Sequence, residues 1–209
     1  MLRNVKQFQP DDLLGVAIKK NSSGDIHSGI VFDAGSGSKF IHLAGEKVIS
    51  EAPSEKYRWL KAGIDESTKK VAAGMCALIE ARSPEVPYAF DRAGWTFDDA
   101  GDVVSGAPGK GMTCATFILA VFDAIRFPLL KEHQWPRGAD KGEKLSIFSM
   151  IFGGDRIESD HASKAMNDDD TPRIRPSEVA ASTTETAFPV AYPLAKKRGA
   201  ALEKKLDKL

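Results

Sequence analysis

The N-terminal quarter of the chain alternates short apolar runs with small polar turns, a pattern typical of antiparallel strands. The runs cover residues 13–20, 26–33 and 39–45, and glycine and serine separate them. Residues 46–50 extend the pattern by one more short run. We therefore expect a small antiparallel sheet at the start of the chain.

From about residue 54 the apolar positions recur every three or four residues, which predicts helices. We expect one helix within residues 54–64 and a second over residues 65–82. The predicted apolar face of the second helix is Val71, Met75, Leu78 and Ile79. Prolines then predict irregular chain or short edge strands up to about residue 97.

A glycine-rich segment leads to a third predicted helix, TCATFILAVFDAIRF. Thr113 is the expected N-cap, which places Cys114 in the first turn. Unpaired N–H groups and the helix dipole at that end favour a thiolate, the form of cysteine that attacks carbonyl carbons. The alternative is that Cys114 is a small buried apolar residue, as free cysteines often are. Cys76 lies within a helical face, where the structural interpretation is favoured.

Two histidines lie on neighbouring predicted strands, His27 on the first and His42 on the next. If the strands pair through the turn DAGSGS, the two imidazoles can meet. If this pair faces a cysteine at a helix start, one imidazole would take the thiol proton, and the other would hold the first in the tautomer that can accept it. Alternatively, each histidine is a half-buried sheet residue.

Composition narrows the choice of function. The 209 residues carry 29 Lys plus Arg and 29 Asp plus Glu, so no net charge favours a nucleic acid as partner. The N-terminus lacks the apolar region of a signal peptide, and no run is long enough for a membrane span. We expect a cytoplasmic protein with reduced cysteines, without integral membrane association, although export by a non-classical route stays open.

The length suits a single domain over residues 1–209. We expect a catalytic core at about 13–150 and a C-terminal extension at about 151–209. Within the extension, the sequence predicts a helix that starts at Ser177 and a charged amphipathic helix at the end of the chain. His133 and His161 lie in polar segments and are expected at the surface.

The segments HSGIVFDAGSGSKFIHLAG and GMTCATFILAVF resemble the histidine hairpin and the cysteine helix of circularly permuted papain-like proteins. These belong to the NlpC-like superfamily, in the branch with the YiiX-like and lecithin retinol acyltransferase-like families. The resemblance covers residues 13–128. It implies an α+β fold with a small antiparallel sheet packed against the cysteine helix. It also implies that Cys114 is the nucleophile, His27 the base and His42 the orienting third residue.

The same resemblance suggests further site residues. A tyrosine upstream of the cysteine commonly lends its hydroxyl to such sites, and Tyr88 is available, although farther from Cys114 than usual. We assign Tyr88 and Thr113 as oxyanion or substrate-binding residues, and the N–H of Cys114 as an oxyanion donor. No cofactor is expected. Zinc held by Cys114, His27 and His42 is a weaker alternative.

The sequence therefore predicts a cysteine peptidase or amidase that acts through an acyl-thioester on a peptide, isopeptide or other acyl-containing substrate. A lipid acyltransferase or thioesterase with the same site is the second interpretation. A binding module that kept the fold without turnover is the third.

Overall fold

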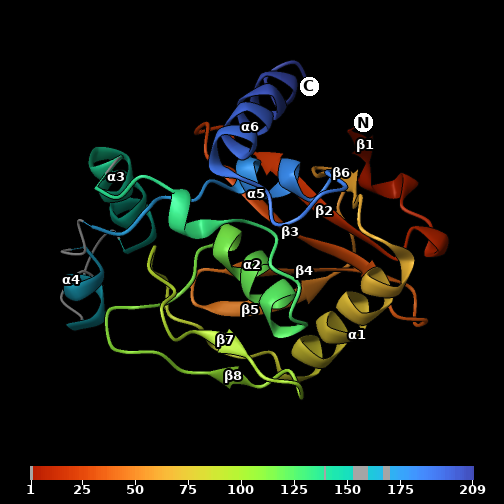
Figure 1. Ribbon diagram of the computed structural model, residues 1–209, viewed down its shortest axis with the longest axis horizontal. Helices are drawn as coiled ribbons and strands as arrows, with labels where there is room; N and C mark the ends of the chain where they lie inside the picture. Colours follow the sequence, from red (N-terminus) through yellow and green to blue (C-terminus); the bar gives the residue numbers. More distant parts are fainter. Residues whose placement is uncertain (1, 139, 153–159, 167–169) are drawn as a thin grey trace.

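A six-stranded antiparallel sheet forms the centre of the molecule, in the order β1-β6-β2-β3-β4-β5 (Figure 1). The computed structural model describes residues 2–138, 140–152, 160–166 and 170–209. The strands of the sheet are β1 (Arg3–Asn4), β2 (Leu14–Lys20), β3 (Ile26–Asp33), β4 (Ser38–Ala44), β5 (Lys47–Glu51) and β6 (Arg58–Lys61). The predicted α+β class and the N-terminal antiparallel strands are confirmed.

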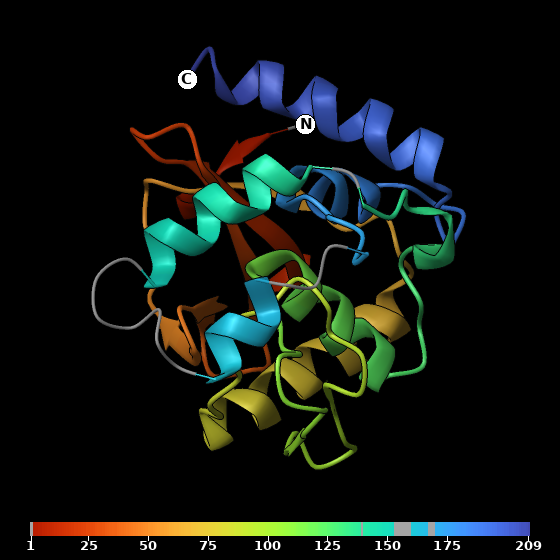
Figure 2. The ribbon, with the colours of Figure 1, turned by 90° about the vertical axis from the view of Figure 1, so that its left-hand side faces the viewer.

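Helices cover one face of this sheet and one end of it. The α-helices are α1 (Glu66–Arg82), α2 (Cys114–Ala124), α3 (Lys141–Phe152), α4 (Asp160–Met166), α5 (Pro176–Ser182) and α6 (Tyr192–Leu206). The short strands β7 (Thr96–Phe97) and β8 (Val103–Val104) form a separate pair. Helices α1, α2 and α5 pack against the sheet, α6 packs on α5, and α3 and α4 lie together at one end (Figures 1 and 2). None of the helices in the described ranges is long and apolar enough to cross a membrane.

The alternation of side chains along the strands produces two apolar clusters. The larger one lies between the sheet and the helices and includes Val16, Ile30, Phe32 and Ile41 together with most of α2. The smaller one lies on the opposite face and consists of Val5, Phe8, Ala17, Val31, Phe40, Tyr57 and Trp59. Because neighbouring residues of a strand point to opposite faces, each central strand contributes to both clusters.

The prediction of a helix within residues 54–64 is wrong, because residues 58–61 of this segment form strand β6. In β6, Trp59 joins the smaller cluster and Leu60 the larger one, which is the alternation of a strand. The strand pairs with both β1 and β2. Its hydrogen-bond partners are distant in sequence, so local spacing could not reveal them.

The helix expected over residues 65–82 is confirmed, and Asp65 caps it by accepting from the N–H of Thr68. Its predicted apolar face is only partly right. Met75 and Ile79 are buried, whereas Val71 is 56% exposed and Leu78 is 43% exposed. The residues buried beside Met75 and Ile79 are Ala72, Ala73 and Cys76. Small side chains face the core here, so a spacing rule that weights large apolar residues misplaces the buried face.

Candidate active site

Cys114 is the first residue of α2, as the sequence predicts. Thr113 is the N-cap: its hydroxyl accepts from the N–H of Thr116 at 3.2 Å. The Thr116 hydroxyl accepts in return from the N–H of Thr113 at 2.8 Å, so two of the free donors at the helix start are satisfied. The N–H of Cys114 lies in the same first turn, where backbone donors lack an acceptor within the helix.

The two histidines are in contact, as expected from the predicted hairpin. Nε2 of His27 lies 2.7 Å from Nδ1 of His42. The pairs between β3 and β4 run from Asp33–Ser38 to Ile30–Ile41, and continuing this register places His42 opposite Gly29. His27 is therefore the diagonal neighbour of His42 on the same sheet face.

Gly29 makes this contact possible. A Cβ atom at position 29 would lie 2.6 Å from Cβ of His42 and 2.5 Å from the carbonyl oxygen of Ile41. On its other side, the His42 ring stacks on Phe40, with ring centres 4.6 Å apart. The glycine and the phenylalanine together hold the His42 ring beside His27.

A cavity of about 300 Å³ brings the predicted residues together. Cys114, His27, Tyr88 and Thr113 all line it, and His42 lies behind His27 in contact with its ring. Four of the five predicted site residues therefore line this cavity, and His42 reaches it only through His27. His27 and Ser28 are neighbours on β3, so the imidazole pair, which packs on Phe40 and Tyr57, and the Cys114 thiol, which contacts Ser28, lie on opposite faces of that strand. The other walls are mixed. They carry an apolar group, made of Ile26, Leu43, Ile147, Met150, Ile151 and Ile174, and a charged group, made of Lys20, Asp25, Glu143, Arg173, Arg175 and Glu203.

The Cys114 thiol is directed at strand β3. The backbone N–H and the hydroxyl of Ser28 both donate to its sulfur and stabilise the thiolate. Apart from this interaction, the buried Ser28 hydroxyl has no hydrogen-bond partner among the described residues. Burial raises the pKa of the Cys114 thiol, and its effect exceeds the opposing effects of Ser28 and of the Arg173 charge. The resting site therefore holds a thiol, and the thiolate expected from the helix dipole alone requires a base.

Both imidazoles are neutral in the resting site. Burial, the neighbouring His42 and the charge of Lys19 lower the pKa of His27 from 6.5 to about 3. Burial also lowers the pKa of His42, against the opposing charge of Glu51, whose Oε1 lies 3.5 Å from His42 Nε2. A neutral imidazole can accept a proton, so His27 has the protonation state that a general base requires.

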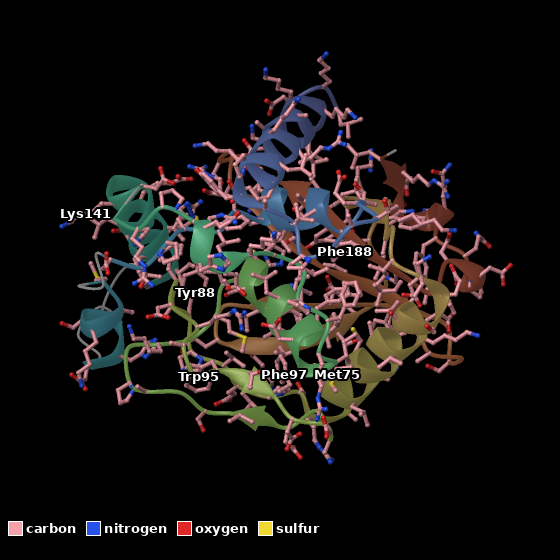
Figure 3. All side chains as sticks on the ribbon, in the orientation of Figure 1. Met75, Tyr88, Trp95, Phe97, Lys141 and Phe188 are labelled. Carbon is pink, nitrogen blue, oxygen red and sulfur yellow. The ribbon has the colours of Figure 1, made fainter. Side chains whose placement is uncertain are left out.

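Tyr88 is placed beside Cys114 by backbone hydrogen bonds. The N–H of Gly111 donates to the carbonyl of Asp91, and that of Met112 donates to the carbonyl of Pro87, both at 2.8 Å. The Tyr88 ring packs against Phe90 and Phe148, on the side of α2 that faces α3 and α4 (Figure 3).

His161 is not the surface residue that the sequence predicts. Its Nδ1 accepts from the N–H of Gly109 at 3.3 Å, so its Nε2 carries the proton and donates to the carbonyl of Tyr88 at 3.1 Å. The histidine of α4 therefore fixes the wall of the cavity. Its partners lie more than 50 residues away in sequence, and the polar residues around His161 do not indicate that it is part of a site.

Sequence reasoning also missed Arg173, which lines the cavity. Its side chain is only 9% exposed, it pairs with Glu143 at 2.7 Å, and its guanidinium lies 5.6 Å from the centre of the Phe90 ring. The positive charge of Arg173 favours the thiolate of Cys114. In the sequence Arg173 is one of two arginines shortly before a predicted helix, so only the tertiary contact distinguishes it.

Comparisons with known proteins identify no relative: no family model, no curated protein and no solved structure matches this chain. Within the described ranges, no group of three or more His, Cys, Asp or Glu side chains is arranged to hold a metal ion. The functional argument therefore rests on the geometry of the site.

Proposed function

We propose that this protein is a cysteine-dependent hydrolase of amide or peptide bonds, with the permuted papain-like order of site residues. The observation that supports this proposal most directly is that Cys114, at a helix start, and His27, which contacts His42, line the same cavity. Nucleophile, base and orienting group are the three parts that a thiol hydrolase requires.

The chemistry follows from the protonation states. His27 takes the proton of the Cys114 thiol as the sulfur attacks the substrate carbonyl, and the N–H of Cys114 donates to the oxyanion. The carbon–nitrogen bond breaks, the leaving amine receives the proton from His27, and an acyl-thioester remains on Cys114. Water then attacks the thioester with His27 as base, which releases the acid and restores the thiol.

The apolar part of the cavity wall favours a substrate with an apolar group near the reacting carbonyl, because burying that group there removes it from water, and the charged part of the wall can bind polar groups of the same substrate. The same observation supports the second candidate, a thioesterase or acyltransferase that accepts a fatty acyl chain. Hydrolysis of peptide amides and of acyl thioesters, measured in parallel on the same preparation, separates the two candidates.

The test of activation is the pH dependence of iodoacetamide labelling at Cys114. Cys76 is fully buried, so labelling of the folded protein reports Cys114. We expect His27→Ala to slow labelling at neutral pH by at least about a hundredfold, the lower end of the usual range of base catalysis. Thr68→Ala, which changes a helix start away from the cavity, serves as the control.

The binding module without turnover predicts a different result. In that case Cys114 reacts like an ordinary thiol, with a pKa of about 8.5 or above, and His27→Ala changes nothing. Equal labelling of the wild type and the His27→Ala variant at every pH would refute the hydrolase proposal. Cys114→Ala must also abolish any hydrolysis that is found.

A further inference from the structure

Four polar side chains form a row across four neighbouring strands on one face of the sheet. Lys19 of β2 is directly opposite His27 of β3. His42 of β4 is the diagonal neighbour of His27, and its own partner in β5 is Ile49. Glu51, two residues after Ile49, shares this face and lies diagonal to His42. The order across the sheet is thus Glu51, His42, His27, Lys19.

The hydrogen atoms along this row can be assigned from its acidic end. Oε1 of Glu51 lies 3.5 Å from Nε2 of His42, a charge contact rather than a hydrogen bond, and this buried nitrogen has no hydrogen-bond partner among the described residues. The negative charge of Glu51 attracts an N–H, so it favours the tautomer of His42 with the proton on Nε2. That ring is neutral, and its Nδ1 is then an acceptor. Since His42 Nδ1 lies 2.7 Å from Nε2 of His27, the latter must donate. In neutral His27, the remaining lone pair is then on Nδ1.

We propose that Glu51 is a positioning residue, which acts through His42 to hold His27 in the tautomer with a basic Nδ1. This inference deepens the proposed function and rests on it for its catalytic meaning. Glu51 sets the direction of the hydrogen bond between the two histidines, which the pair alone leaves open. Without Glu51, either ring can carry its proton on either nitrogen, and the pair can hydrogen-bond in both directions. In one of these directions Nε2 of His27 accepts and its Nδ1 carries a proton, so it cannot act as a base.

The charges around the pair support this role. Glu51 raises the pKa of His42, whereas Lys19 lowers the pKa of both histidines. Tyr57, which also borders the row, lies with its ring 4.7 Å below the Lys19 ammonium. Glu51 is therefore the group that stabilises positive charge on the pair when His27 takes the thiol proton, and it is half-exposed and free to adjust.

The tautomer is measured directly by nitrogen-15 NMR of protein labelled at histidine, because protonated and lone-pair nitrogens have well-separated shifts. His27→Gln and His42→Gln assign the signals. We expect a lone pair on Nδ1 and a proton on Nε2 for both rings in the wild type. In Glu51→Ala we expect a mixture of tautomers. A proton on Nδ1 of His27 in the wild type would overturn the proposal, whatever the activity of the protein.

A variant that removes only the charge of Glu51 tests whether Glu51 stabilises positive charge on the histidine pair. Glu51→Gln keeps an oxygen acceptor for His42 Nε2, so the tautomer should persist in the NMR spectrum. Loss of the charge should move the midpoint of Cys114 alkylation up by about half to one pH unit, the low end of the effect of a nearby charge. Glu55→Gln is the matched control, since Glu55 is exposed and pairs with Lys6.

The outcomes separate this proposal from the proposed function. If Cys114 is inert in the wild type but the tautomers respond to Glu51→Ala, the hydrolase proposal fails and the positioning role stands. If Cys114 is active and neither the tautomers nor the alkylation midpoint respond to the Glu51 variants, the positioning role is wrong and the hydrolase proposal stands.

Discussion

Burial of the histidine pair gives the protein an acid-sensitive residue. The pKa of His27 is lowered from 6.5 to about 3, so the folded protein binds a proton there much less readily than the unfolded chain. Between these two pH values the unfolded chain carries the proton and the folded protein does not. Stability therefore rises with pH across this window, and the contribution is complete above pH 6.5.

We predict that His27→Gln weakens the dependence of stability on pH. From pH 7 to pH 4.5, the denaturant midpoint should drop more for the wild type than for His27→Gln, because glutamine takes up no proton in either the folded or the unfolded state. His133→Gln, at an exposed position, controls for the general loss of carboxylate charges. An equal drop for the wild type and His27→Gln would show that His27 is not buried in its neutral form.

The strongest constraint on an element of the site is the close approach of two loop segments at Gly111. A Cβ atom at this position would lie 1.9 Å from the carbonyl oxygen of Pro87, which is backbone and cannot rotate away. The same carbonyl accepts from the N–H of Met112. The segment that carries Tyr88 and the segment before Cys114 can therefore approach this closely only because residue 111 is a glycine.

Gly111→Ala should lower the free energy of unfolding by about 1–3 kcal/mol, the usual cost of overpacking, and should slow any hydrolysis by displacing Tyr88 from the cavity. Urea unfolding measures the first effect. Gly74→Ala is the matched control: Gly74 is in helix α1 and a Cβ atom there would meet open space, so alanine should stabilise the fold by about 0.5–1 kcal/mol. Unchanged stability of Gly111→Ala would mean that the two segments are not in contact.

At the scale of the whole molecule, the C-terminal segment is part of the structure that holds the site. Helix α5 packs on β2, β3 and α2. Its Glu178 is buried, and the carboxylate accepts from the indole N–H of Trp135 and from the N–H of Arg175, both at 3.0 Å. Arg173 and Arg175, which line the cavity, precede this helix directly.

We predict that Glu178→Ala lowers the free energy of unfolding by about 1–3 kcal/mol, because two donors, the buried indole N–H of Trp135 and the part-buried N–H of Arg175, lose their acceptor. Glu178→Gln, which keeps one acceptor oxygen, should cost less. Fluorescence and circular dichroism should report one shared transition for the wild type, since the C-terminal segment and the sheet share a core. A separate early transition of the α-helical signal would contradict this.

Much of this protein is specified by local pattern. Short apolar runs separated by glycine and serine predicted β2 to β5, and the spacing of large apolar residues with Thr113 in front predicted α2, because these signals depend only on neighbours along the chain. The pairing of His27 with His42 followed from the same local logic, since one turn joins the two strands. Sequence alone therefore determined the sheet at the start of the chain, the cysteine at the helix start and the two histidines in contact.

The tertiary structure decided the rest, for a physical reason that recurs. Strand β6, the exposed side of α1, the bonds of His161 and the place of Arg173 each depend on partners many residues away. The charge states also depend on the fold: the helix dipole favours a thiolate at Cys114, but burial outweighs it and leaves a thiol beside neutral imidazoles. Desolvation is a property of the packed molecule, so no spacing of residue types could have revealed it.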